Sequence, residues 1–97
     1  MTLPRDEYLL RRAEQVMNAK QHDYTGGNAD RLIAFRQIAD LAGLTLGQVW
    51  AVFFLKHVTA VTQWAQGRQP EGEQVMERLV DIINYARFAA LIDEEDS

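Results

Sequence analysis

The chain has no cysteine among its 97 residues and only two prolines. Without cysteine neither a disulfide framework nor a thiolate site can form, and nothing indicates secretion. Long apolar runs are also missing. The longest, VWAVFFL at residues 49–55, is far shorter than the ~20 residues of a membrane span. The N-terminus lacks the basic and then apolar order of a signal peptide. We therefore expect a cytoplasmic protein that does not enter a membrane.

Basic residues are few: ten Lys and Arg against 14 Asp and Glu give a net charge of −4. Binding in a nucleic-acid groove requires clustered Lys and Arg to neutralise phosphates, so we do not expect it. A small nucleotide could still be held by a metal ion or by a few local cations. Because no serine precedes Ser97 and the histidines are His22 and His57, no Ser-His-Asp or Cys-His arrangement is predicted. We assign no catalytic residue.

Four helical patterns fill the chain, with no strand pattern and no internal repeat. They predict an all-α fold, a compact four-helix bundle that forms a single domain over residues 1–92. Residues 93–97 are expected to be an acidic, disordered tail. The predicted helices cover residues 4–20, 31–42, 45–66 and 73–91.

The helix boundaries rest on capping residues. Asp30 is an N-cap candidate for the second helix, and Gly43 follows its end as a C′ glycine usually does. Thr45, with Gln48 three residues later, predicts a capping box for the third helix, and Gly67 ends that helix.

The segment QHDYTGGNADR, residues 21–31, separates the first two predicted helices. Its glycines lack the spacing of a P-loop or of a dinucleotide-binding loop. Gly26 and Gly27 therefore indicate a tight turn rather than a phosphate site.

The third predicted helix has an unusually broad apolar surface. At ~100° per residue, apolar side chains cover half of its circumference or more, whereas the stripe of a surface helix starts from ~100°. This helix is therefore expected to be either the central helix of the bundle or half of an oligomer interface. Three other helices in so short a chain would not cover it fully. We expect a homo-oligomer formed through this helix, with a dimer favoured. The residues are Val49, Trp50, Phe53, Phe54, Val58, Ala60, Val61, Trp64 and Ala65.

His57 falls near the middle of that apolar surface. A buried imidazole needs a hydrogen-bond partner. One interpretation is a core histidine that a neighbouring side chain or carbonyl satisfies. The other is a ligand or general base that faces a pocket between helices.

The fourth predicted helix carries a polar stripe. Its members, Glu73, Glu77, Asp81 and Asn84, are spaced by 4, 4 and 3 residues, so they share one side of the helix. Three acids in a row repel one another unless a cation or open water relieves them.

One interpretation of the stripe is a solvated face, because apolar residues supply a buried side elsewhere. The other is a site for Mg²⁺, which prefers carboxylate oxygens, with Glu73, Glu77 and Asp81 as ligands. One helix rarely makes a metal site, so further ligands would come from Asp23, His22 or Asp40. The residues of the expected buried side are Val75, Leu79, Ile82, Ile83, Ala86 and Ala90.

Four segments taken in order suggest a family. HDYTGG, AFRQIADLAG, a helix with FLKH, and EQVMERLVDIINYA together resemble the small phage and prophage proteins grouped as nucleotide modification associated domain 1. The resemblance covers residues 14–91 and implies a bacterial host and a context of DNA modification or nucleotide metabolism. Its motif positions fall on Asp23, Tyr24, Lys56, Glu73, Glu77, Asp81, Asn84 and Tyr85.

Three positions depart from that family pattern. Thr25 precedes the glycines where the family has Gly directly after Tyr, Ala34 stands in place of Asn, and Thr59 stands in place of Arg. A weaker likeness links the chain to the all-α MazG-type nucleotide pyrophosphatases, which hold Mg²⁺ between a Glu-x-x-Glu pair and a Glu-x-x-Asp pair. The third helix here carries Lys56 and His57 and no Glu-x-x-Glu pair, which argues against hydrolysis by that two-helix metal site.

Three hypotheses follow. The first is a phage-type protein that binds a nucleotide or a nucleotide-derived ligand, with Mg²⁺ at Glu73, Glu77 and Asp81. The second is a non-catalytic oligomeric interaction module that acts on a host or phage protein. The third is a divergent Mg²⁺-dependent pyrophosphatase, and on balance the sequence favours a protein that is not an enzyme. In the first hypothesis the ligand-binding residues are Asp23, Tyr24, Lys56, His57, Asn84 and Tyr85.

Overall fold

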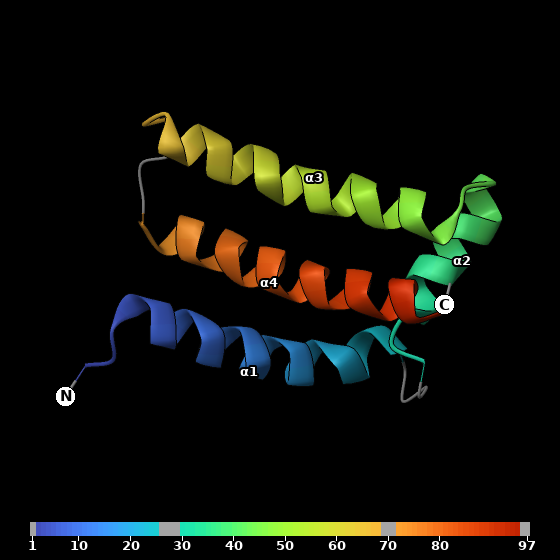
Figure 1. Cartoon of the computed structure of the whole chain (residues 1–97), viewed down its shortest axis with the longest axis horizontal. Helices are drawn as coiled ribbons and strands as arrows, with labels where there is room; N and C mark the ends of the chain where they lie inside the picture. The colour runs from blue at the N-terminus through green and yellow to red at the C-terminus, as the bar shows by residue number, and fades with distance from the viewer. Residues whose placement is uncertain (1, 26–29, 69–71, 96–97) are drawn as a thin grey trace.

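The computed structural model describes residues 2–25, 30–68 and 72–95, without the side chains of residues 20–25 and 72–74. Within these ranges the chain forms four α-helices and no strand (Figure 1). This result confirms the predicted all-α four-helix bundle. The helices are α1 (Arg5–Thr25), α2 (Ile33–Ala42), α3 (Leu46–Ala65) and α4 (Gly72–Glu95).

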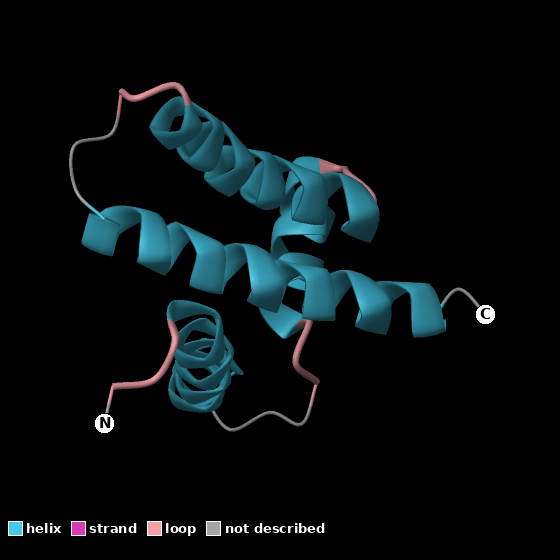
Figure 2. Cartoon of the chain, turned by 60° about the vertical axis from the view of Figure 1, so that its left-hand side comes forward, coloured by secondary structure: helices cyan, strands magenta, loops and turns pink. Residues whose placement is uncertain are grey.

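The central helix of the bundle is α4, not α3. Figures 1 and 2 place α4 between α1 and α3, with α2 at the end where α4 finishes. In the part of the chain that the structure describes, α3 and α1 each pack on α4 but not on each other. α1 runs parallel to α4, and α3 runs antiparallel to it (Figure 1). The other long helices are therefore held together mainly through α4, with α2 as a second link between them.

Local sequence signals account for the ends of α2 and α3. Gly43 caps α2 in the left-handed conformation with φ 68°, which glycine adopts without the steric penalty of a Cβ atom. Thr45 and Gln48 form the predicted capping box at the start of α3. α2 begins at Ile33, two residues later than predicted. Asp30 instead accepts a hydrogen bond from the Leu32 N–H (2.9 Å) in the preceding turn.

Two predicted helix ends were too early. α1 continues to Thr25, so the first residues of the segment 21–31 are helical, whereas the predicted Gly26–Gly27 turn lies outside the described residues. α4 continues to Glu95, and the prediction of a disordered tail was therefore wrong for residues 93–95. Arg36 of α2 binds the Glu95 carboxylate, an ion pair that helps to hold this end of α4.

α2 closes one end of the bundle with an aromatic cluster. Phe35 of α2 lies 5.9 Å from the rings of both Phe53 and Tyr85 and 5.3 Å from that of Phe88. Val49 of α3 is fully buried against the same group. Tilted and edge-to-face aromatic contacts of this kind add to the free energy gained from buried area. The core is therefore concentrated where α2 meets α3 and α4.

The side of the molecule opposite α2 is not covered by a helix. Ala86 lies two residues before Phe88 and so points ~200° away from the aromatic cluster. Both Ala86 and Ala90 are exposed, and Leu79, Ile82 and Ile83 are only half-buried. Of the expected buried side of the fourth helix, only Val75 is buried. The prediction was wrong for Ala86 and Ala90, because α4 has apolar side chains on more than one side.

In the described residues no single helix is both long enough and apolar enough to cross a membrane. The pair α2 and α3 would meet that test together, but the two helices are bent by 107°.

Asp30 is predicted to stabilise the fold only above acidic pH. The hydrogen bond from Arg36 (2.6 Å) and then the Leu32 N–H lower the pKa of the Asp30 carboxyl below its ordinary value. A lowered pKa gives stability that is present above the unfolded-state pKa and is lost as pH falls through the folded-state pKa. Because the side chain is about one-third exposed, we expect Asp30→Asn to lower the free energy of unfolding by at most ~1 kcal/mol at pH 7.

Urea unfolding at pH 7 and at pH 2.5 checks this prediction. The difference in the free energy of unfolding between Asp30→Asn and the parent protein should disappear at the lower pH. Asp40→Asn is the control, at an exposed residue of α2. If Asp30→Asn lowered the free energy of unfolding equally at both pH values, that result would contradict the assigned role of the carboxylate.

Candidate functional site

The predicted site residues do not form one site in the structure. His57 and Asp81 meet where α3 packs on α4, Asn84 and Tyr85 lie in the interior, and Asp23 and Tyr24 belong to the last turn of α1. Lys56 and Glu77 are exposed.

His57 is buried, with 8% of its surface exposed, between α3 and α4. Its Nδ1 lies 3.2 Å from Arg78 Nη1 and 3.5 Å from Asp81 Oδ2. When the ring is neutral with its proton on Nε2, Nδ1 accepts a hydrogen bond from Arg78. When the ring is protonated, Nδ1 donates toward Asp81 instead. The geometry supports the core interpretation of His57, because neighbouring side chains satisfy the buried ring.

Asn84 fastens α4 to α1. It is 6% exposed, and its side-chain Nδ2 donates to the Ala13 carbonyl at 3.0 Å. Its Oδ1 is buried and has no hydrogen-bond partner in the described part of the chain. A residue enclosed in this way between two helices holds them in register, and its amide does not face a ligand from outside.

Tyr85 belongs to the aromatic cluster. Its ring lies 5.7 Å from Phe88 and 5.1 Å from the His57 ring. Its backbone carbonyl accepts a hydrogen bond from Trp50 Nε1 (2.7 Å). These contacts explain the residue as part of the α2–α3–α4 core, where its ring is not free to stack on a base.

Asp23 and Tyr24 lie far from the polar stripe of α4. The hydrogen bond from Asn84 to Ala13 and the ion pair from Arg87 to Glu14 (3.1 Å) set the register of the two parallel helices. In this register Asp81 is level with about residue 10 of α1, so the backbone of Asp23 is ~20 Å further along, at ~1.5 Å per residue. Their side chains lie outside the described set, but the structure does not bring these two parts of the predicted site together.

The described side chains do not assemble the predicted Mg²⁺ site. Among the side chains that the structure describes, no group of three or more His, Cys, Asp or Glu is close enough to hold a metal ion. Asp81 is engaged with His57, Glu77 is exposed, and Asp40 is exposed on α2. The side chains of Glu73, His22 and Asp23 lie outside the described set.

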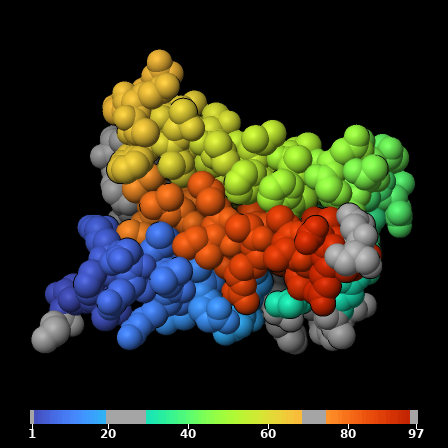
Figure 3. All heavy atoms as spheres, viewed as in Figure 1, coloured from blue at the N-terminus to red at the C-terminus, as the bar shows by residue number. Residues whose placement is uncertain are grey.

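A row of partly exposed apolar residues runs along α3 and α4, and we name it the α3–α4 face. Val49 and Phe53 point toward α2, so Trp50 and Phe54, one residue later in each case, lie ~100° further around α3, on the side away from α2. Trp50 and Phe54 stack with ring centroids 4.8 Å apart. Figure 3 shows α1, α4 and α3 next to one another with no helix over them. The residues of the α3–α4 face are Trp50, Phe54, Val58 and Val61 of α3 and Leu79, Ile82, Ile83, Ala86 and Ala90 of α4.

Sequence reasoning found the α3 half of this face and missed the α4 half. The available signal was that α4 has apolar residues on two sides. Leu79, Ile83 and Ala86 form one row, and Val80 and Phe88 lie on a different side of the helix. Since only one of these rows could be the main buried side, the second indicated a surface in need of a partner.

Comparison of the chain with family models, with curated proteins and with solved structures returns no match. The resemblance to the phage nucleotide modification family and the weaker likeness to MazG-type enzymes therefore stay predictions.

The role of Asn84 as a fastener between α1 and α4 predicts a strong penalty for a charge at this position. Asn84→Asp would place a carboxylate in a nearly closed site beside the Ala13 carbonyl. We expect the free energy of unfolding to fall by about 2 kcal/mol or more at pH 7. The loss should shrink as pH falls, because a protonated carboxyl is neutral and can donate to that carbonyl.

Chemical unfolding between pH 7 and pH 4 measures this effect. Asn18→Asp is the matched control, because residue 18 is exposed on α1 and should tolerate the same change. If Asn84 instead faced a ligand in an open site, Asn84→Asp and Asn18→Asp would both lower the free energy of unfolding by the same small amount.

Proposed function

We propose that the protein is a non-catalytic interaction module that works as a homodimer, with the second copy packed on the α3–α4 face. The observation that carries the proposal is the uncovered apolar side of the two helices that form the largest contact in the fold. The described polar residues of the predicted site support it, because Asn84, His57 and Asp81 hold helices together.

The accessible surface is large for one chain of this size. It amounts to 6858 Å² for a mass of 11.1 kDa, whereas a folded monomer of that mass exposes about 5,700 Å². The excess of about 1,200 Å² exceeds the ~800 Å² that each partner buries in a standard interface. The fold is thus more open than that of a typical monomer of this mass, as expected if a second copy covers part of its surface.

The chemistry of the face fits an obligate type of interface. It contains two aromatic residues, five branched aliphatic residues and two alanines, and none of its residues is charged. Apolar and aromatic surface without charge is typical of the centre of a homodimer interface. The alanines allow two copies of α4 to approach closely about a two-fold axis, where the same patch meets itself.

The two ligand-based hypotheses receive less support from the geometry. A nucleotide site built from Asp23, Tyr24, Lys56 and the α4 stripe would have to span ~20 Å along the bundle. Two of its residues, Asn84 and Tyr85, belong to the interior. The phage and nucleotide context thus rests on the sequence resemblance alone.

Ala86→Glu tests the dimer directly. In a single chain Ala86 is exposed, so the new carboxylate stays in water and the monomer fold tolerates it. In the proposed dimer the carboxylate is buried without a partner. Light scattering should give twice 11.1 kDa for the parent protein, and the dimer dissociation constant of the variant should rise about 100-fold, ~2.7 kcal/mol.

Ala19→Glu is the matched control, at an exposed position of α1 outside the α3–α4 face, and should leave the mass unchanged. If Ala86→Glu does not fold alone, the melting temperature of the parent should still rise with protein concentration, as mass action requires for a dimer. A parent protein that is monomeric at micromolar concentration, with a melting temperature independent of concentration, would refute the proposal.

A further inference from the structure

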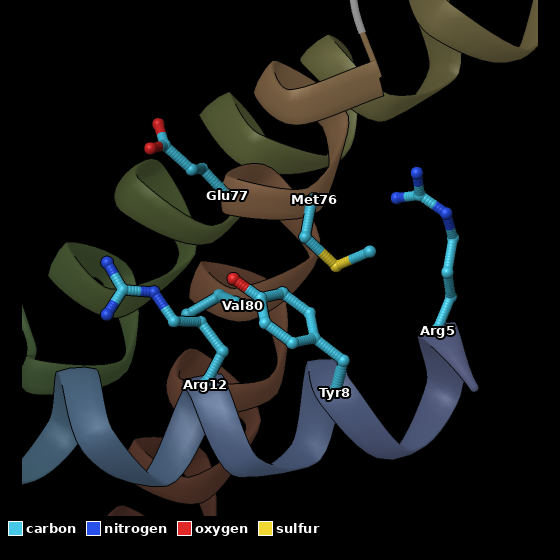
Figure 4. A pocket seen from close by; sticks show the side chains of 6 residues that line it. All are labelled: Arg5, Tyr8, Arg12, Met76, Glu77 and Val80. Atoms are coloured by element: carbon cyan, nitrogen blue, oxygen red, sulfur yellow. The ribbon is translucent and has the colours of Figure 1, made fainter. Parts of the chain in front are cut away.

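A groove separates the first turns of α1 from the start of α4. Its volume is about 340 Å³, within the range of small-molecule sites. Val80, only 3% exposed, forms part of its floor, and Tyr8, 47% exposed, presents its ring to the opening. Figure 4 shows the Tyr8 ring beside Met76 and Val80. The groove thus combines an apolar floor with an accessible aromatic ring.

Two arginines flank that ring. Arg5, Tyr8 and Arg12 are spaced by three and four residues and so share one side of α1. Figure 4 shows the Arg5 and Arg12 guanidinium groups on opposite sides of Tyr8. In the described part of the chain neither guanidinium forms an ion pair, whereas Arg36 and Arg87 both do. Glu77 also lines the groove, and Figure 4 shows its carboxylate directed away from the Tyr8 ring.

We propose that this groove binds a small aromatic anion, a flat ring that carries a phosphate or carboxylate group. The ring stacks on Tyr8 above Met76 and Val80, and the anion binds Arg12 or Arg5. A guanidinium group matches the geometry of a phosphate or carboxylate with two parallel hydrogen bonds. The two arginines are ~10 Å apart along the helix axis, so a ring over Tyr8 can place its anion at either one.

This site is independent of the proposed dimer. None of the groove residues belongs to the α3–α4 face, and none belongs to the predicted nucleotide site except Glu77. The groove and the dimer can therefore be tested separately.

Calorimetric titration of the full chain with 1-naphthyl phosphate tests the site, with 1-naphthol and inorganic phosphate as the two partial probes. We expect 1-naphthyl phosphate to bind at least tenfold more tightly than either partial probe, because only it uses both the ring and the arginines. Arg12→Gln combined with Arg5→Gln should weaken binding at least tenfold. Arg11→Gln, at an exposed neighbour outside the groove, should leave it unchanged.

Two further variants separate this site from attraction by surface charge in general. Tyr8→Ala should weaken 1-naphthyl phosphate about tenfold and leave inorganic phosphate unaffected. Glu77→Gln should strengthen binding several-fold, since Glu77 is the one negative group among the described residues that line the groove. Circular dichroism confirms that each variant is folded. No binding at millimolar probe, or equal weakening by Arg11→Gln and by the paired groove variant, overturns the proposal.

Discussion

The packing of α4 against three neighbours is the constraint on which the rest of the structure depends. One side of α4 receives α1, a second receives α3, and a third meets the aromatic cluster that includes Phe35 of α2. Because α1 and α3 do not pack on each other in the described residues, the bundle has no central core enclosed by four helices. The hydrophobic interior is instead divided between contacts that all involve α4 or α2. A fourth side of α4 is left without a neighbour, and its side chains there are aliphatic.

The same constraint explains which features could be read from the sequence. Helix type and the ends of α2 and α3 depend on local chemistry: Gly43 takes a left-handed conformation and Thr45 pairs with Gln48. The side of α4 that is buried depends on the neighbours, and more than one side is apolar. Asn84 shows the limit, since it shares a row with Glu77 and Asp81 yet lies inside, on the Ala13 carbonyl. The ends of α1 and α4 were also missed, and at the end of α4 the reason is an ion pair to Glu95 from Arg36 of another helix.

The candidate site was predicted less well than the fold for a related reason. The order of motifs along a chain does not say which residues of two packed helices lie side by side. Here α1 and α4 are parallel, with Asn84 at Ala13 and Arg87 at Glu14, so the end of α1 meets the end of α4 and not its middle. Among the described side chains of the predicted site, His57 lies beside Asp81 and Tyr85, and the three residues meet as part of the packing of α3 on α4. The groove was missed because Arg5, Tyr8 and Arg12 look like an ordinary exposed side of a helix until α4 is placed beside them.

A chain of this length has little stability to spare. Its uncovered apolar side lowers the stability of the monomer further, because that side stays in contact with water. Covering the α3–α4 face with a second copy would add buried aliphatic area at ~25 cal/mol per Å² without a new core in either chain. Folding and association would then be linked, so that the population of folded protein depends on its concentration. In such a dimer the α4 helices of both copies would become the true centre of the structure, each with neighbours on all four sides. In the proposed dimer, the open side of α4 is thus half of a core that is completed between two chains.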